Sequence, residues 1–411
     1  CCFGMAWWLW VGLGLLLLLV VYYEIMRVMR RKLYPKIAVP HRDATQSERE
    51  LMQLRWKDYS NAVPDTVFLV TGGAGSLGTH LVQALVNANA REVRVFDLQV
   101  GSISGVHYLR GDITDVSALR EAMQGVDTVF HMASLIDYFG HQDSLLQKVN
   151  VQGTKSVLRA AQEAAVKKVV YTSSTAVLTD GLGIQGGDQH HPYPGYQVDA
   201  YGRTKAAAER LVLEANGVAG VLTCAIRFHL PFGIGCLINE IYTQYPSNYI
   251  VFDFPGHRLA SPIACQNVAH AHICAHKTLL PDSPVAGNPY TVGDTKLSYL
   301  QMASAQRKHM GLDAPVVKSK WLGLTLCVVC EYLSMLSALW HKLSLGKVPR
   351  IKPLVTRSQL SYAYDNHDVD LEPAFRDLHF EPIISFEEAN QALGVYYQQR
   401  MNALKKPNKQ E

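Results

Sequence analysis

The stretch Val67-Phe68-Leu69-Val70-Thr71-Gly72-Gly73-Ala74-Gly75-Ser76-Leu77-Gly78 decides the fold of this 411-residue chain. It begins with apolar strand formers and ends in glycines, and apolar residues at helical spacing, Leu81 and Leu85, follow it. Strand, glycine turn and helix in this order are typical of a dinucleotide site, because glycines let the backbone approach a pyrophosphate at the amino terminus of the helix. We predict that the site uses five residues of this turn, namely Gly72, Gly75, Ser76, Leu77 and Gly78.

A second strand-like run, Glu92–Asp97, ends in an acid about 25 residues after Gly72. A carboxylate at this place accepts hydrogen bonds from ribose hydroxyls and repels a 2′-phosphate, so Asp97 favours NAD over NADP as the cofactor. The alternative is that Asp97 only closes a turn or caps a helix.

Further strand-like segments at 111–115, 127–134 and 167–174 alternate with helical patterns. This rhythm predicts a parallel sheet with helices on both faces, whose ligands bind at the carboxyl ends of the strands. We therefore expect the cofactor site to include Asp112, Ile113 and Ala133, and Ser174 to lie at the same edge of the sheet. Asn150 begins the next helical pattern, where it either positions backbone near the site or simply caps the helix.

Tyr201 and Lys205 are four residues apart in a helical pattern, so their side chains project from one face about one turn apart. An ammonium group beside a tyrosine stabilises the phenolate, and we expect Lys205 to lower the pKa of Tyr201 from its usual value of about 10. A tyrosine tuned in this way can transfer protons near neutral pH. The pair therefore predicts an acid/base device beside the nucleotide site.

With these residues assembled, the chain resembles an extended short-chain dehydrogenase/reductase, and specifically the 3β-hydroxysteroid dehydrogenase/isomerase family, from about Val67 to Ala389. Besides the glycine turn and the Tyr201 and Lys205 pair, the segments that carry the resemblance are Ile136–Gly140, Asn150–Thr154, Tyr171–Ser174, Leu213–Gly217, Cys224–Arg227, Asn267–His272, Ala374–Pro382 and Ser385–Ala389. The resemblance implies an α/β fold: a Rossmann-type doubly wound parallel sheet with a smaller C-terminal substrate-binding region.

The resemblance also implies roles for single residues. Tyr201 would transfer the proton, Lys205 would support it and clamp the ribose, and Ser174, with Ser173 as the runner-up, would hydrogen-bond the substrate oxygen. The implied reaction is NAD-dependent oxidation of a 3β-hydroxysteroid or sterol to the 3-ketosteroid. Δ5–Δ4 isomerisation is an open addition, for which we assign no acid/base group. The alternative within the family is oxidation of a 4α-carboxysterol, whose 3-keto product loses carbon dioxide.

Three positions depart from the family pattern: Phe228, Pro231 and Ala264. The resemblance puts them near the nicotinamide end and the substrate mouth, so they leave the choice of substrate open. A non-catalytic, membrane-tethered NAD-binding protein therefore stays as an alternative of another class. A membrane-anchored nucleotide-sugar epimerase or decarboxylase is a third, and it would predict a lumenal domain.

The run from Met5 to Tyr23 carries no charge and, at about 1.5 Å per residue, nearly spans a hydrocarbon layer of about 30 Å. Basic residues between Arg27 and Lys32 follow it, which predicts that the chain beyond them faces the cytosol. A cleaved signal peptide is the alternative, although its positive region would precede the apolar run. We expect a single-pass membrane protein in the endoplasmic reticulum, the family's usual membrane; Cys1 in place of methionine leaves room for residues before it.

The expected organisation is a transmembrane helix at 1–23, a tether at 24–65, an NAD-binding domain at 66–230 and a substrate-binding region at 231–411. Within the last, Leu322–Trp340 is again apolar, but a polar stripe runs along it, formed by Glu331, Ser334, Ser337 and His341. This pattern favours an amphipathic helix at 321–342 that lies in the membrane interface and lets a sterol pass from lipid to the site. A helix packed within the substrate region is the alternative.

The composition of the chain limits the kinds of partner that it can bind. The net charge of +4 argues against nucleic acid, and the basic cluster beside the first apolar run points to membrane orientation instead. The eight cysteines lack a disulfide-framework spacing, so we expect reduced thiols. The cysteines and histidines also show no zinc spacing, and we expect no metal. A homodimer is compatible with the sequence.

Overall fold

The computed structural model describes residues 63–137, 142–236, 239, 251–252, 259–311, 316–317, 319–345 and 356–405. The predicted transmembrane helix at 1–23 lies outside the described residues, as does the tether up to residue 62.

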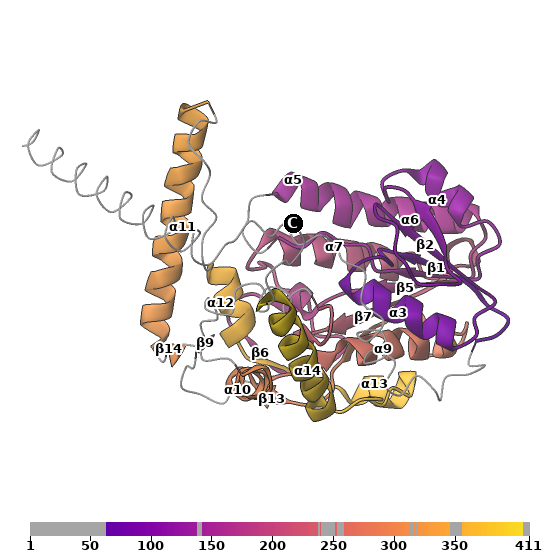
Figure 1. The fold of residues 1–411 in the computed structure, drawn as a ribbon. Coiled ribbons are helices and arrows are strands. Elements are labelled where there is room, and N and C mark those ends of the chain that lie inside the picture. Colours follow the sequence, from indigo (N-terminus) through magenta and orange to yellow (C-terminus); the bar gives the residue numbers. More distant parts are fainter. Residues whose placement is uncertain are drawn as a thin grey trace, which may run out of the picture.

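Seven parallel strands form one sheet in the order β12-β7-β5-β4-β1-β2-β3 (Figure 1). Their bounds are β1 (Val67–Thr71), β2 (Glu92–Asp97), β3 (His107–Arg110), β4 (Thr128–His131), β5 (Lys168–Thr172), β7 (Leu222–Phe228) and β12 (Pro289–Val292). The central strands β1 and β4 are buried along their whole length, because both faces of a parallel sheet are covered by helices. The predicted α/β fold with a doubly wound parallel sheet is confirmed.

Helices cover the sheet on both faces, and side chains of β1 alternate between the two cores. Phe68 and Val70 pack with α3 (Ser76–Asn87) and α9 (Cys265–Thr278). Val67 and Leu69 pack with the helices of the opposite face, which are α4 (Val116–Ala122), α6 (Gly153–Glu163) and α7 (Ala200–Glu214). Because successive side chains of a strand point to opposite faces, apolar residues cover both faces of β1.

The sheet draws on both halves of the chain. Strand β12 pairs with β7, and α9 packs on α3, although β12 and α9 follow residue 230 in sequence. The predicted boundary at 230 therefore falls between two neighbouring strands of one sheet.

The remaining strands are short, and they pair segments that are distant in sequence. The strand pairs are β8 (Pro231–Phe232) with β11 (Ile263–Ala264), β10 (Leu259–Ala260) with β13 (Leu297–Ser298), β9 (Val251–Phe252) with β14 (Val316–Val317), and β6 (Ile184–Gly187) with β15 (His367–Val369). The helices are α5 (Asp143–Leu146), the π-helical turn η2 (Gln147–Gln152), η3 (Thr175–Leu178), η4 (Val218–Gly220), α10 (Tyr299–Met310), α11 (Lys320–Leu343), α12 (Arg357–Tyr364), α13 (Glu372–Leu378) and α14 (Phe386–Lys405).

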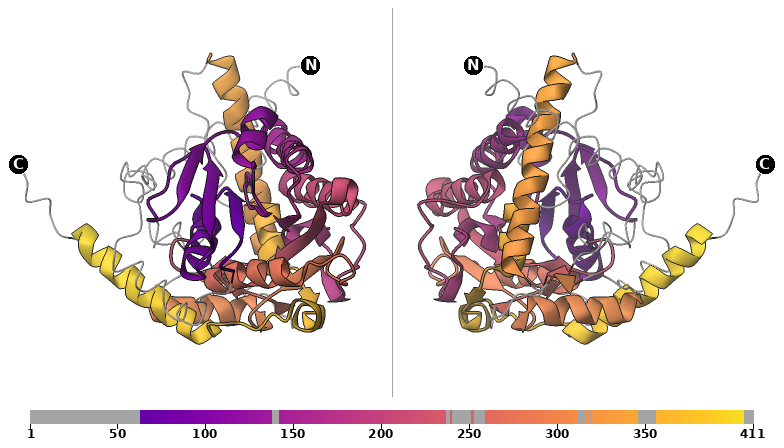
Figure 2. Two further views of the ribbon diagram at one scale, coloured as in Figure 1. Left: turned by 90° about the vertical axis from the view of Figure 1, so that its right-hand side faces the viewer. Right: turned by 90° about the vertical axis from the view of Figure 1, so that its left-hand side faces the viewer.

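Helix α11 stands along one side of the molecule (Figure 2), and the burial of its polar side chains shows that its polar side faces inward. Ser334 and Ser337 are buried, and Glu331 is largely covered. Its outward face is apolar, with exposed side chains at Trp321, Leu322, Val328, Val329, Tyr332, Met335, Leu339, Trp340 and Leu343. The predicted polar stripe thus exists, but it contacts protein and leaves the apolar face outside.

A buried ion pair joins α7 to the sheet. Glu209 on α7 and Arg227 on β7 are both essentially inaccessible to solvent, and their closest atoms, Oε1 and Nη2, lie 2.6 Å apart. Tyr193 also donates to Glu209, at 2.6 Å. Burial alone would raise the pKa of Glu209, but the guanidinium charge and these hydrogen bonds hold it below its usual range.

We expect Glu209→Ala to lower the free energy of unfolding by about 3–5 kcal/mol, because it leaves the buried Arg227 charge uncompensated. Urea unfolding of the purified chain, followed by circular dichroism, measures this change. Glu163→Ala is the matched control, since Glu163 forms a more exposed pair with Arg159 and its loss should cost at most about 1 kcal/mol. Equal losses in the two variants would contradict a structural role for the buried pair.

Candidate functional site

The glycine turn between β1 and α3 permits backbone approaches that a side chain would prevent. Gly72 has a φ of +72°, and a Cβ atom there would lie 2.7 Å from the Cα of Ala133. A Cβ atom on Gly78 would collide with the carbonyl oxygen of Gly72. Gly75 precedes the first turn of α3 without a side-chain cap, so the amides of Ser76 and Leu77 lie in a turn that can receive an anion. The turn fits a pyrophosphate.

Asp97 closes β2 beside this turn. One carboxylate oxygen accepts a hydrogen bond from the amide of Ala74 at 3.1 Å, and the other accepts one from the amide of Gln99, also at 3.1 Å. The carboxylate therefore lies against the glycine turn, where a ribose would follow a pyrophosphate. This position is compatible with both functions that the sequence suggests for Asp97, which are accepting hydrogen bonds from the ribose and closing a turn.

The other predicted cofactor residues lie at the ends of the neighbouring strands. Asp112 follows β3 and accepts hydrogen bonds from the amide and hydroxyl of Thr114, both at 2.9 Å. The side chain of Ile113 is buried and packs against Gly153. Ala133 follows β4, and its amide donates to the Thr71 hydroxyl at 3.4 Å. All three thus lie at the carboxyl edge of the sheet, as the sequence predicts.

Asn150 links the loop after β4 to the helix that carries Tyr201. It lies inside the π-helical turn η2, a distortion that is often found at functional sites. Its Oδ1 accepts from the amide of Leu135 at 2.8 Å, and its Nδ2 donates to the Thr204 hydroxyl at 3.1 Å. Asn150 therefore positions backbone near the site and does not cap a helix.

Ser174, Tyr201 and Lys205 come together at the carboxyl end of β5. The side chain of Ser174 lies close enough to Tyr201 to lower the pKa of its hydroxyl, and Ser174 Oγ also accepts from the amide of Ala176 at 3.2 Å. Lys205 Nζ donates to the carbonyl oxygen of Thr172 at 2.6 Å and lies 4.2 Å from the centre of the Tyr171 ring. Ser173 is buried, so Ser174 is the serine that contacts Tyr201 in this structure.

The expected direction of the Tyr201 pKa is wrong for this structure. Burial raises the pKa of Tyr201 above its usual value; the hydrogen bond from Ser174 only partly offsets this, and the nearby charge of Asp199 adds to it. Burial also lowers the pKa of Lys205, to about 7, since a charged ammonium loses its hydration there. Local spacing places the two groups on one face, but enclosure by protein dominates their protonation.

His131 shows the same effect of burial. It lies between the hydroxyls of Thr71, at 2.8 Å, and Thr154, at 2.9 Å. Burial, with the nearby Lys205 charge, lowers the pKa of His131 to about 3, so the ring is neutral at physiological pH. It ties β4 to β1 and α6 and does not act as a proton donor.

Two residues of the site were missed from sequence. Asp199 caps α7 by accepting from the amide of Gly202 at 2.8 Å, and Tyr362 donates to the same carboxylate oxygen at 3.1 Å. An acid just before a helical pattern is a signal that could have identified Asp199. Tyr362 is 163 residues further along the chain, and no local pattern connects the two.

The three departures from the family pattern lie around one short strand pair. Phe228 ends β7, and Pro231 lies in β8, which pairs with the strand β11 that contains Ala264. All three are at least partly buried, with Ala264 and Phe228 in the protein interior.

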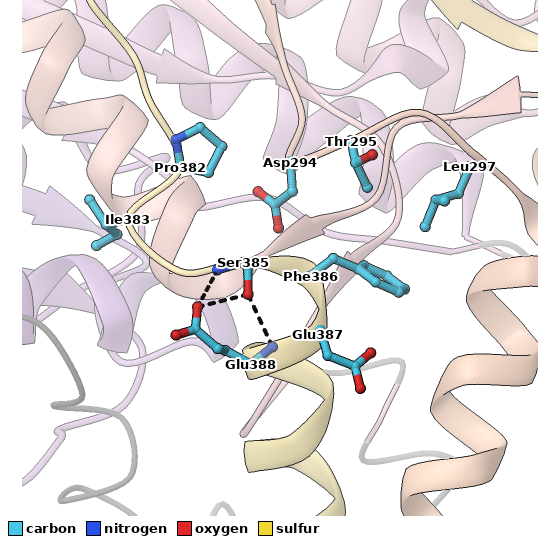
Figure 3. Close-up of a pocket in the computed structure, with 9 residues that line it drawn as sticks. All are labelled: Asp294, Thr295, Leu297, Pro382, Ile383, Ser385, Phe386, Glu387 and Glu388. Carbon is cyan, nitrogen blue, oxygen red and sulfur yellow. Dashed lines mark hydrogen bonds between the residues drawn. The ribbon is translucent and has the colours of Figure 1, made fainter.

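A cavity of about 520 Å³ lies between the segment after β12 and the start of α14 (Figure 3). Its lining residues are Asp294, Thr295, Leu297, Pro382, Ile383, Ser385, Phe386, Glu387 and Glu388, and it includes none of the predicted site residues. Burial raises the pKa of Asp294 to about 7, while its oxygens accept from the amide of Ala264 and the side chain of Asn267, both at 2.7 Å. These bonds join the segment after β12 to the first turn of α9.

Comparisons with known proteins identify relatives of this chain. A 3 beta-hydroxysteroid dehydrogenase/Delta 5-->4-isomerase of Mycobacterium tuberculosis is 31% identical over 354 residues, which cover 80% of this chain and 90% of that protein. The decarboxylating sterol-4-alpha-carboxylate 3-dehydrogenase of Mus musculus is 29% identical, with 78% and 88% covered. Among solved structures, an epimerase from Methanothermobacter thermautotrophicus shares the fold, with a TM-score of 0.65 at 18% identity over 86% of this chain and 98% of that one.

The model of the 3-beta hydroxysteroid dehydrogenase/isomerase family matches residues 69–319, more than half of the chain. This match and the relatives above confirm the resemblance predicted from the glycine turn and the Tyr201 and Lys205 pair. The chain therefore belongs to the 3-beta hydroxysteroid dehydrogenase/isomerase family and is an NAD-dependent oxidoreductase.

Proposed function

We propose that the chain oxidises the 3β-hydroxyl group of a steroid or sterol to a ketone. The observation that carries this proposal is the placement of Ser174 beside Tyr201, with Lys205 one turn further along α7 and bonded to the end of β5, at the sheet edge that also holds the glycine turn. NAD supplies the hydride acceptor when bound. The Ser174 hydroxyl would orient the substrate oxygen. Tyr201 would accept its proton in the phenolate form, which the positive charge of bound NAD would stabilise against the effect of burial, as the C–H bond breaks.

The cofactor would be held by residues from four strand ends. The glycine turn and the first amides of α3, from Gly72 to Gly78, would receive the pyrophosphate, and Asp97 the ribose hydroxyls of the adenosine. Asp112, Ile113 and Ala133 would border the adenine and the middle of the cofactor, and Lys205 the nicotinamide ribose. In its charged form, Lys205 would favour the phenolate form of Tyr201 and so oppose the effect of burial.

Relatives support two substrate classes. One is a 3β-hydroxysteroid, since the mycobacterial relative bears that name, and the second candidate is a 4α-carboxysterol, the substrate named for the mouse relative. Both share the 3β-hydroxyl and so need the same Ser174, Tyr201 and Lys205. The presence of all three at one edge of the sheet argues against a non-catalytic NAD-binding protein.

We also propose that the chain works on a membrane. Trp321–Leu343 is long and apolar enough to cross one, but its polar side is occupied by protein contacts, which favours a helix lying in the interface. The exposed apolar side chains of α11 would enter the lipid, and the Met5–Tyr23 run would anchor the chain. The endoplasmic reticulum with a cytosolic catalytic domain is the proposed location.

Tyr201→Phe should reduce turnover by at least about 100-fold, because it removes the proton acceptor, while leaving NAD binding nearly unchanged. NADH formation by the purified chain against a panel of 3β-hydroxysteroids and 4α-carboxysterols measures turnover, and fluorescence titration measures NAD binding. Tyr332→Phe, on the exposed face of α11, is the control. Tight NAD binding by the wild type without turnover of any compound would favour the non-catalytic alternative.

The buried Lys205 should make stability depend on pH. Because its folded pKa is about 7 and its ordinary value is 10.5, the folded chain binds fewer protons than the unfolded chain between these limits. The contribution of Lys205 to the free energy of unfolding therefore rises with pH through this window and is lowest below it. We expect the Tm of the wild type to increase relative to Lys205→Met from pH 7 to 9.5. A difference that does not change with pH would contradict the lowered pKa.

A photoactivatable phospholipid offers a direct test of the membrane contact. The full chain is reconstituted into vesicles that contain this lipid, irradiated, digested and analysed by mass spectrometry. We expect lipid adducts on α11 at Val329, Met335 and Leu339. The exposed residues of α10 provide the internal control and should carry none. Adducts confined to residues before 63 would show that α11 does not contact the bilayer.

A further inference from the structure

Helix α12 (Arg357–Tyr364) lies between α11 and the body of the protein that contains α7 (Figure 1). It has 8 residues, and a helix of this length is not stable by itself. Its position must therefore come from contacts with the rest of the protein. Both ends make such contacts, one with α11 and one with the catalytic helix.

Glu331 of α11 holds the amino end of α12. Its Oε1 accepts from the backbone amide of Arg357 at 2.6 Å, and its Oε2 accepts from Nε of the same residue at 2.7 Å. A carboxylate at this place satisfies a free amide of the first helical turn and interacts favourably with the helix dipole. Glu331 thus acts as a cap that is supplied by another helix.

Tyr362 holds the other end against the catalytic helix. Its hydroxyl donates to Asp199 Oδ1 at 3.1 Å, and its carbonyl oxygen accepts from Nε2 of His229 at 3.3 Å. The ring packs in the same apolar cluster as Tyr201 and Leu135. Tyr362 therefore contacts the cap of α7 and the surroundings of the reacting hydroxyl at once.

Asp199 is sensitive to the loss of a donor. Its carboxylate is buried, and burial raises its pKa even though Gly202 and Tyr362 donate hydrogen bonds to it. Without Tyr362, a buried carboxylate loses one of its stabilising bonds, and the cap that precedes Tyr201 can rotate to find another. The orientation of Tyr201 follows from the orientation of this first turn.

We propose that Tyr362 is a positioning residue for Tyr201, and that Glu331 keeps Tyr362 in place by capping α12. Helix α11, with its outward apolar face, is then coupled to the catalytic turn through α12. The kinetic consequence of this coupling rests on the proposed function, whereas the structural consequence does not.

The kinetic test compares Tyr362→Phe, Glu331→Ala and the double variant, as full chains in vesicles, with NAD and the steroid that the wild type oxidises best. Each single variant should lower kcat about 10-fold, and KM for NAD should stay within about twofold. The double variant should be no slower than the slower single variant, because both changes interrupt one chain of contacts. Multiplied losses in the double variant, or an unchanged kcat in Tyr362→Phe, would overturn the proposal.

Two controls separate coupling from general damage. Tyr332→Phe removes an exposed tyrosine hydroxyl from α11, and Glu387→Ala removes an exposed carboxylate from α14. Both should keep kcat within about twofold of the wild type. A loss like that of Tyr362→Phe in either control would mean that the assay reports stability and not position.

Hydrogen exchange tests the same coupling without turnover. In Glu331→Ala, amides of residues 357–364 and of the first turn of α7, including Gly202, should exchange faster, while those of β1 and β4 stay unchanged. Faster exchange that stops at α12 would overturn the coupling. If the wild type oxidises no sterol of the panel, the proposed function fails, and this measurement still decides the role of α12.

Discussion

Two backbones approach each other at the end of β1, and the site depends on this contact. Gly72 and Ala133 lie so close that a methyl group on the glycine would overlap the neighbouring chain. Strands β1 and β4 are neighbours in the sheet, and the order of the strands reverses between them, because β2 and β3 lie on the other side of β1. Such a reversal opens a crevice at the carboxyl ends of parallel strands. The turn, Asp97 and the catalytic group all border that edge.

Hydrogen bonds from polar side chains then fix the elements around the crevice. Asn150 joins the loop after β4 to α7, and His131 joins β4 to β1 and α6. Glu209 and Arg227 join α7 to β7 beneath the reacting groups. Each of these side chains is buried and its partners are specific, so each restricts the position of α7 more than apolar packing would. These hydrogen bonds and this ion pair together determine the position of Tyr201 on α7.

The parts of the site that lie within short stretches of sequence could be predicted. The glycine turn and the Tyr201 and Lys205 pair carry their own spacing, and the strands that they adjoin are short apolar runs. Tyr362 and β12 could not be predicted, because their partners are far away in sequence and no local pattern encodes such pairing. The predicted direction of the Tyr201 pKa shift was wrong for a different reason. Spacing in the sequence identifies a neighbouring side chain, whereas burial depends on the complete fold. The inward direction of the polar side of α11 likewise depends on what packs against it.

The late position of β12 in the chain affects how the protein is made. While a ribosome is still synthesising residues before 289, β7 is the last available strand of the sheet, and its outer edge has amide and carbonyl groups without partners from β12. Unpaired edges of this kind pair with other chains. Because the apolar helix α11 is synthesised still later, the nascent chain keeps unpaired surface exposed for longer. A fragment that ends near residue 230 would keep that edge permanently, so it should aggregate even though it contains the cofactor turn and the catalytic tyrosine.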